Sequence, residues 1–347
     1  MRVGDFKESY AADEAVFRTS TARFWLGVFL VALAVFPFVA GDYLLYMANL
    51  TGVAIVAAVG LNILTGAAGQ ISLGHAAFVG IGAYTSAILV TRLGLPFLLC
   101  LPLSGLAAAF FGVIVGAPSM RMKGLYLCIA TLAAQVIFEF IFVHWVPVTG
   151  GIRGINVPAA TVFGLQLDTE FKFYFVTIPI VILVVTAARN LFRTRVGRAF
   201  IAIRDRDISA ELMGINLFQY KLYAFATSSF FAGVAGCLNV FLLKVVTPEH
   251  FPLHESVRYL AMIIVGGLGS VLGSIFGAIF MTMVPEALQS LLNLFQGLDP
   301  AVMEYLFPLQ TVIFGLLIVV FLVFEPQGLA EIWRRVKDYF RLWPFEH

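Results

Sequence analysis

The sequence is poor in charge, since only 12% of its 347 residues are Asp, Glu, Lys or Arg, whereas 61% belong to the hydrophobic set. Soluble globular domains carry about 25% charged residues, because their surfaces must be hydrated. A water-soluble fold is therefore excluded for most of the chain, and lipid is its expected solvent. The net charge of +2 is small and the basic residues are dispersed, which excludes a nucleic-acid partner.

The sequence also lacks the common motifs of catalysis. It has no GxxxxGK[ST] phosphate loop, no HExxH and no GxSxG. Its three cysteines, Cys100, Cys128 and Cys237, lie far apart without metal-ligand or paired spacing, so we expect neither a zinc site nor a disulfide framework. We predict no catalytic residue, metal or cofactor. If ATP drives this protein, the nucleotide must bind another chain.

Long apolar runs fill the sequence. A membrane-spanning helix needs about 20 mostly apolar residues. The candidate spans are Phe24–Val39, Leu44–Leu64, Ile71–Val90, Leu95–Gly116, Leu125–Val143, Phe173–Ala188, Leu222–Leu243 and Leu306–Phe324. The runs do not alternate between apolar and polar residues, which excludes a membrane β-barrel. We predict an all-α, polytopic membrane protein with about 8–10 membrane-embedded helices, including broken or re-entrant Gly-rich segments.

The positions of lysine and arginine predict the orientation of the chain across the membrane, because short cytoplasmic loops are rich in both residues. The segment Arg189–Arg206 holds six arginines and is expected in the cytoplasm. We predict a cytoplasmic N-terminal segment (1–23), a membrane domain (24–325) that includes a cytoplasmic loop (190–221), and a cytoplasmic basic tail (326–347). Acids interrupt the N-terminal segment, so it does not resemble a cleavable signal peptide.

A second feature is the apolar region Val257–Phe295, which is broken by glycines. For the basic tail to be cytoplasmic, this region must return to the side that it entered from. It makes either two tilted crossings or a re-entrant hairpin over Tyr259–Met283. The hairpin is favoured, since a helix of that length reaches about 37 Å and two crossings need roughly 60 Å. We predict that Gly266, Gly267, Gly269 and Ser270 lie beside a substrate path.

An earlier glycine-rich passage follows the second span, in a region without charged residues. Gly66 and Gly69 have the same spacing as Gly266 and Gly269, which indicates either an internal repeat or a chance similarity. Polar residues inside a membrane usually face a cavity or a neighbouring helix. The passage predicts either a path for a small polar solute or interhelical hydrogen bonding. Its candidate residues are Asn62, Thr65, Gly66, Gly69, Gln70, Ser72 and His75.

The predicted cytoplasmic loop contains a short helix within Gly197–Asn216. Asp205 or Asp207 can cap its start and Gly214 can end it. A short, charged and partly apolar helix is typical of a segment that docks into a groove on a soluble partner. The alternative is a helix that lies on lipid headgroups.

Four long stretches resemble the LivM-type permeases of branched-chain amino acid ABC importers. They are GLNILTGAAGQISLGHAAFVGIGAY (60–84), RMKGLYLCIATLA (121–133), VGRAFIAIRDRDISAELMGINLFQYKLYAFA (196–226) and YLAMIIVGGLGSVLGSIFGA (259–278). The resemblance implies a multi-pass subunit of the bacterial inner membrane that works by alternating access. The implied partners are a LivH-like permease, two cytoplasmic ABC ATPases and a periplasmic substrate-binding protein.

The resemblance also implies that the loop helix couples the permease to its ATPases, with no nucleic acid involved. The implied coupling residues are Arg198, Arg204, Asp205, Arg206, Ala210, Glu211 and Gly214. The usual Glu-Ala-Ala of this loop is replaced by Ser209-Ala210-Glu211, whereas Gly214 is retained, so the resemblance implies the coupling role rather than the exact contact residues. Two other hypotheses remain: an ATP-independent channel or carrier for a small polar solute such as urea, and a membrane scaffold that docks a soluble protein.

Overall fold

The structure is a computed structural model that describes residues 20–119, 122, 124–162, 164–293, 312–316, 318–321, 323–325 and 327–342. Among these residues, seven helices are long and apolar enough to cross a membrane. These seven helices are α3 (Asp42–Leu61), α4 (His75–Leu93), α5 (Phe97–Ser119), α6 (Leu125–His144), α8 (Glu170–Arg193), α11 (Leu217–Leu243) and α13 (Val271–Asn293). The helix α2 (Ser20–Val39) contains a shorter apolar run, Phe24–Val39. The prediction of an all-α, multi-pass membrane protein is confirmed.

Shorter elements connect or flank the long helices. They are the π-helix η1 (Asn62–Ala67), α7 (Val146–Thr149), η2 (Gly151–Arg153), β1 (Ile155–Asn156), β2 (Thr161–Val162), β3 (Leu165–Gln166), α9 (Arg195–Asp205), α10 (Asp207–Leu212), β4 (Val245–Val246), η3 (Pro248–His250), α12 (Leu253–Gly266) and α15 (Leu329–Leu342). Residues 1–19, Arg121 and Lys123 lie outside the described residues. Of the predicted last span, residues 312–316, 318–321 and 323–324 are described and are helical.

The chain divides into two units, Met1–Tyr46 and Met47–His347. In the second unit, α11 packs along α4 and α5 and forms the centre of the bundle. Most of α11 is buried, including Phe225 and Leu238. The outward face of α5 exposes large apolar side chains such as Leu106 and Phe110, as expected for a helix that faces lipid or another membrane subunit.

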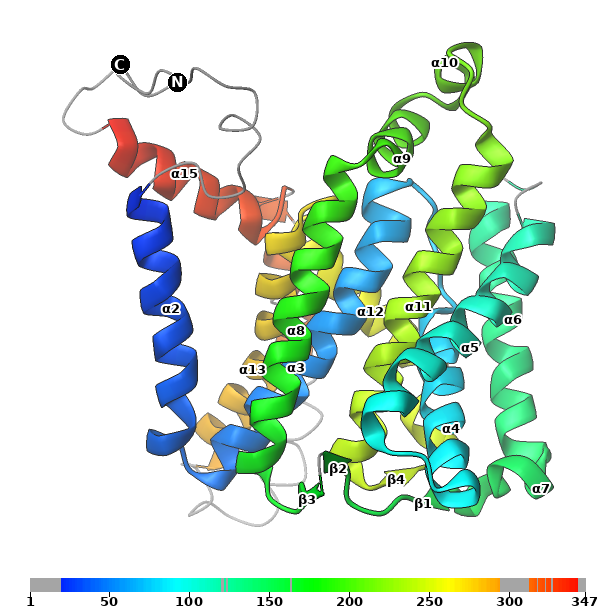
Figure 1. Ribbon diagram of the computed structural model, residues 1–347. Helices are drawn as coiled ribbons and strands as arrows, with labels where there is room; N and C mark the ends of the chain where they lie inside the picture. The colour runs from blue at the N-terminus through cyan, green and yellow to red at the C-terminus, as the bar shows by residue number, and fades with distance from the viewer. Residues whose placement is uncertain are drawn as a thin grey trace. The chain divides into compact units, whose positions relative to one another are not determined.

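The second unit has two different ends. The strands β1 and β4 pair antiparallel, with Ile155 opposite Val246, and lie with α7 at the end that we call the β4 end. The helices α9 and α10 lie at the opposite end, the α9 end (Figure 1). The strands β2 and β3 form a second small hairpin at the β4 end.

The first glycine passage interrupts the helix that α3 begins. The helix widens into η1, where the Ala68 amide bonds the Ile63 carbonyl, and ends before Gly69, which has a φ of +68°. A π-turn inside a helix is frequent at functional sites. From Gly69 to Gly74 the chain is neither helix nor strand, and exposed residues alternate with buried Gln70 and Ser72.

The second glycine passage forms the turn of a helical hairpin. The helices α12 and α13 pack against each other and are joined by four residues, Gly267 to Ser270, which we call the hairpin tip. With 14 residues, α12 reaches only about 21 Å, less than the roughly 30 Å of a bilayer core. Both predicted helix breaks are therefore present.

The helix α15 is amphipathic. It packs against the start of α13, where the rings of Phe276 and Trp333 have centroids 6.0 Å apart. Arg335 of this helix forms an ion pair with Glu325, which precedes the helix, with 2.9 Å between Arg335 Nη2 and Glu325 Oε1. The residues on its exposed side include Trp333 and Tyr339, side chains that favour a membrane–water interface.

Candidate functional site

The two glycine passages, about two hundred residues apart in the sequence, contact each other. The Asn62 side chain donates from Nδ2 to the Ser270 carbonyl (2.8 Å) and to Ser274 Oγ (2.8 Å). Its Oδ1 accepts from the Gly269 amide at 2.8 Å. One buried amide thus satisfies three polar groups of the hairpin. We call this arrangement the Asn62 junction.

The glycines around the junction have no side chains, which allows the two passages to approach this closely. A Cβ at Gly66 would overlap Asn62 Oδ1 and the Gly269 amide nitrogen. A Cβ at Gly266 would overlap the Gly273 carbonyl across the hairpin. Gly267 and Gly269 adopt φ values of +120° and +78°, which favour glycine. The predicted glycines of both passages therefore lie where the backbones come closest or turn most sharply.

Arg204 at the end of α9 joins the same junction. Its Nη1 donates to the Gly66 carbonyl at 3.0 Å, while Nε and Nη2 hold Asp205 Oδ1, both at 3.0 Å. A Cβ at Gly269 would lie 2.9 Å from Arg204 Nη1, so the guanidinium also touches the hairpin tip. Three segments predicted separately, the two glycine passages and the cytoplasmic loop, meet at one guanidinium.

The start of α4 lies inside the bundle, where its first amides need partners because no water reaches them. Side chains from two other helices supply these partners. Ser256 Oγ accepts from the Ala76 amide at 2.9 Å, and Gln135 Oε1 accepts from the Ala77 amide at 2.8 Å. Thr131 Oγ1 accepts from the Leu73 amide at 3.0 Å. These three polar residues were missed from the sequence, although each stands out as a polar residue in an apolar helix.

The remaining polar candidates of the first passage are buried near the same break. His75 Nε2 contacts the Ala57 carbonyl at 2.9 Å, and its ring lies edge-on to Tyr259. Thr65 Oγ1 donates to the Gln70 carbonyl, and Ser72 Oγ accepts from the Gly74 amide. The Gln70 side chain has no hydrogen-bond partner among the described residues. Of these contacts, only that of His75 joins two helices, whereas those of Thr65 and Ser72 are local bonds within the passage. A role in lining a path stays a prediction.

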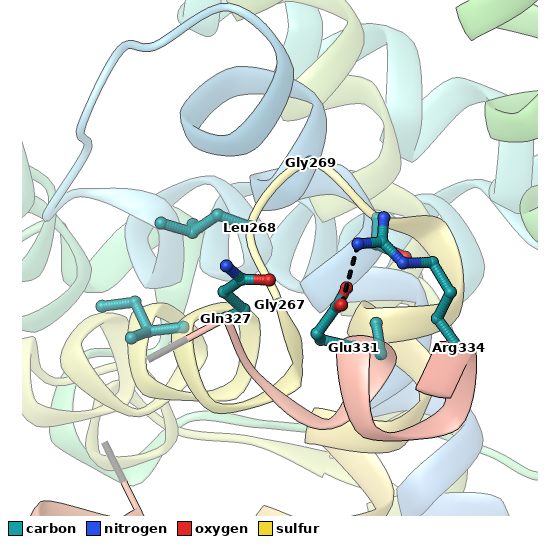
Figure 2. A pocket seen from close by; sticks show the side chains of 9 residues that line it. Gly267, Leu268, Gly269, Gln327, Glu331 and Arg334 are labelled. Carbon is teal, nitrogen blue, oxygen red and sulfur yellow. Dashed lines mark hydrogen bonds and ion pairs between the residues drawn. The ribbon is translucent and has the colours of Figure 1, made fainter. Parts of the chain in front are cut away.

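Two cavities lie at opposite ends of the α12–α13 hairpin. The first has a volume of about 410 Å³ and lies between the hairpin tip and the first turns of α15. Figure 2 shows it with the Glu331–Arg334 ion pair on one side of the tip and Gln327 on the other. We call it the tip cavity.

The second cavity, of about 190 Å³, lies where α12 begins, and we call it the outer cavity. It is lined by α3, the end of α11, η3, α12 and α13. Glu249, His250, Glu255 and Arg258 contribute its ionisable groups. Burial lowers the pKa of His250 below its ordinary value of 6.5, an effect that the neighbouring Glu249 carboxylate partly opposes.

The predicted loop helix consists of two helices, α9 and α10, separated at Arg206, whose extended backbone interrupts the turn. Asp205 does not cap α10, because its carboxylate is held by Arg204. Gly214 follows α10 with a φ of +87°, as expected for a residue that ends a helix.

The two short helices differ in how far their apolar side chains are buried: Phe200 and Ile203 of α9 are buried, whereas most of those of α10 are exposed. The apolar residues Ile208, Leu212 and Met213 of the α10 tip are 68%, 84% and 86% exposed. Of the predicted coupling residues, Ala210 is buried, Arg198 bonds the Arg193 carbonyl, and Arg206 and Glu211 are exposed. The exposed Met213 was not singled out from the sequence, since a single methionine carries no periodic pattern.

No cluster of three potential metal-ligating side chains occurs among the residues that the structure describes. Cys100, Cys128 and Cys237 are free thiols. The apolar helices, the two glycine-lined breaks inside the membrane and a cavity at each end of the hairpin together define a multi-pass membrane permease.

The chain belongs to the family described as "Branched-chain amino acid transport system / permease component", whose pattern matches residues 43–322. It is 33% identical over 335 residues to the high-affinity branched-chain amino acid transport system permease protein LivM of Escherichia coli, which covers 88% of this chain and 75% of that protein. The LivM of Salmonella typhimurium is 32% identical over 91% of this chain and 76% of its own length.

A related permease component also matches, although more distantly. The high-affinity branched-chain amino acid transport system permease protein LivH of Salmonella typhimurium is 26% identical over 67% of this chain and 80% of its own. No solved structure matches the chain. The LivM-type resemblance stated from the sequence motifs is confirmed by the family and by these relatives.

Proposed function

We propose that this chain is one permease subunit of an ATP-binding cassette importer that moves branched-chain or related amino acids across the bacterial inner membrane. The observation that carries the proposal is the contact of Arg204 with the Gly66 carbonyl and the hairpin tip. Through this contact, the loop that we place outside the membrane is hydrogen-bonded to the first helix break at Gly66 and touches the second at Gly269. The printed names of the LivM relatives support the substrate class.

The orientation follows from the arginines. The segment from Arg189 to Arg206 ends at α9, so the α9 end faces the cytoplasm and the β4 end faces the periplasm. We place the N-terminal segment 1–23 and the tail 326–347 in the cytoplasm as well, on the ground of their own basic residues.

The exposed apolar tip of α10 is the proposed docking surface for one of two cytoplasmic ATPase subunits. Exposed Ile208, Leu212 and Met213 form a small apolar knob on a charged loop, which suits a groove on a soluble partner. The relationship to LivH supports pairing with a LivH-like subunit. A periplasmic substrate-binding protein would deliver the amino acid at the β4 end.

The proposed mechanism is alternating access. In the described conformation, the Asn62 junction and the packed α12–α13 glycines lie between the outer cavity and the tip cavity. When the ATPases move α10 and α9, Arg204 transmits the displacement to Gly66 and the hairpin tip. The contacts at the junction then change in favour of the other side.

The test is uptake of radiolabelled leucine into proteoliposomes that contain both permease subunits, with and without the ATPases, ATP and the binding protein. The proposal predicts uptake only when all components and ATP are present. Uptake without ATPases would overturn it in favour of a channel or carrier. No uptake of any tested amino acid or urea with all partners present would favour the scaffold.

The Arg204 contact is tested by Arg204→Gln in the same system. We expect ATP hydrolysis to continue while uptake per ATP falls at least fivefold, because the loop loses its bond to Gly66. Arg195→Gln is the matched control, since Arg195 is an exposed arginine at the opposite end of α9. Equal uptake per ATP in the two variants would contradict the coupling role of Arg204.

A further inference from the structure

We propose that the outer cavity is a subsite for a zwitterionic α-amino acid with a small aliphatic side chain, so that the permease selects its substrate in addition to the binding protein. This inference rests on the proposed function, whose substrate class it specifies. The outer cavity has a volume of about 190 Å³, which is smaller than the roughly 300–1,000 Å³ of sites for drug-sized ligands and indicates that its ligand is a small metabolite.

The charges of the cavity are paired as a zwitterion requires. Arg258 and Glu255 lie one turn apart on α12, 3.3 Å from Arg258 Nη1 to Glu255 Oε1, and Glu249 adds a second carboxylate from η3. The Arg258 guanidinium has five N–H donors and suits a substrate carboxylate, while the glutamates suit its ammonium group. Because two carboxylates accompany one guanidinium, a simple anion is disfavoured.

Part of the lining of the outer cavity is apolar. Leu50, Val53 and Ala54 line the cavity from α3, and Met262 lines it from α12. Such a wall removes an aliphatic side chain from water, which favours leucine, isoleucine or valine over polar amino acids by the hydrophobic effect.

Thr282 supplies an independent observation. It lines the cavity from α13 and is only 3% exposed, yet its Oγ1 has no hydrogen-bond partner among the described residues. A buried hydroxyl without a partner is costly in a folded protein, so each such group needs an explanation. A bound amino acid that bonds Thr282 Oγ1 accounts for it.

The position of the cavity links occupancy to the permease mechanism. The three helices that line most of it, α3, α12 and α13, lead to the Asn62 junction at the other end of the hairpin. A ligand that binds Arg258, Thr282 and the α3 wall would therefore hold together the same helices that the junction joins.

The experiment measures binding of radiolabelled leucine to the purified permease pair in lipid nanodiscs, without binding protein or ATPases. The competitors are leucinamide, which lacks the carboxylate, isocaproate, which lacks the ammonium group, and lysine, which adds a positive charge. We expect saturable leucine binding, and competition by isoleucine and valine at least tenfold better than by these three compounds. Better competition by leucinamide or lysine than by valine would overturn the assignment.

Variants place the binding in the cavity. We expect Arg258→Gln to weaken leucine binding at least tenfold and Thr282→Val to weaken it about threefold. Thr282→Val is nearly isosteric and removes an unpartnered hydroxyl, so it is expected to fold. Arg153→Gln, an exposed arginine at the same end but outside the cavity, is the control. Unchanged leucine binding in both cavity variants would overturn the proposal.

Uptake by the full importer separates this inference from the proposed function. If ATP-driven leucine uptake occurs and Arg258→Gln and Thr282→Val leave its substrate preference unchanged, the subsite is wrong and the importer function stands. If nanodisc binding behaves as expected but the full complex transports nothing, the subsite stands and the importer function is wrong.

Discussion

The Asn62 junction leads to a quantitative prediction for Asn62→Ala. The substitution removes the acceptor of the Gly269 amide and the donor to Ser270 and Ser274. Each buried hydrogen bond contributes about 1 kcal/mol net, and a buried group left without a partner costs about 1–3 kcal/mol. Ser274 Oγ still reaches the Ser270 carbonyl at 3.4 Å, so Gly269 is the group most exposed to the loss.

We therefore expect the hairpin tip to open more easily by about 2–3 kcal/mol in Asn62→Ala. Since about 1.4 kcal/mol corresponds to a factor of ten in an equilibrium constant, amide exchange of the tip should become roughly 30- to 140-fold faster. Hydrogen-exchange mass spectrometry of the permease in nanodiscs, on peptides that cover residues 264–274, measures this change directly.

Asn49→Ala is the matched control, because Asn49 is a similarly buried asparagine of α3, the helix that η1 continues. Its Nδ2 bonds Glu170 at the start of α8, away from both glycine passages. Its loss should destabilise the protein without a selective effect on the tip. Unchanged amide exchange of the hairpin tip in Asn62→Ala would refute the conclusion that the Asn62 junction holds the tip closed. An equal acceleration of that exchange in Asn49→Ala would refute it as well.

Three further predictions concern other positions. Gly66→Ala should lower the thermal unfolding temperature in detergent far more than Gly27→Ala, because a Cβ at Gly66 overlaps the junction whereas a Cβ at Gly27 has nothing within 4 Å; similar melting of both would contradict the close contact. Gly214→Ala and Gly164→Ala both place a side chain at positive φ, at a cost of about 1–2 kcal/mol. Only Gly214→Ala should reduce uptake per ATP, because Gly214 ends the proposed coupling helix whereas Gly164 lies in the β2–β3 turn, at the other end of the unit. Burial lowers the pKa of His250 in the folded protein, so between pH 7 and pH 5 the unfolded chain binds the proton more readily and the folded protein loses stability. The His250→Gln variant should therefore lose less thermal stability over that pH range than the wild type. A larger loss in the variant would contradict the lowered pKa.

Much of the fold follows from the sequence because membrane helices are defined by length and hydropathy. The predicted span Leu125–Val143 corresponds to α6 within one residue at its end, and Leu222–Leu243 lies within α11. The predicted hairpin over Tyr259–Met283 turns at the glycines that were singled out. Here a single physical requirement, apolar surface in lipid, determines the pattern.

The three-way contact at the guanidinium could not be predicted. Gly66, Gly269 and Arg204 are far apart in the sequence, and nothing in their local patterns indicates which backbone carbonyl an arginine reaches. The division of the loop at Arg206 was also missed, because Gly197–Asn216 has helical residues on both sides of the break. The caps of α4 by Gln135 and Ser256 likewise depend on helix packing, which one sequence does not encode visibly.

The unwound chain between Gly69 and His75 has a mechanical consequence. Its six steps reach at most about 20 Å, and it contains no turn of helix whose unwinding would lengthen it. The side chain of Arg204 lies against Gly69 at one end, and Thr131, Gln135 and Ser256 anchor the residues around the other. Such a segment has a fixed maximum reach but little resistance to bending. Under the proposed mechanism, a displacement that pulls Gly69 away from α4 to this reach is passed on to α4, whereas one that pushes Gly69 towards α4 bends the segment instead. The proposed displacement of the loop would therefore act in one direction only.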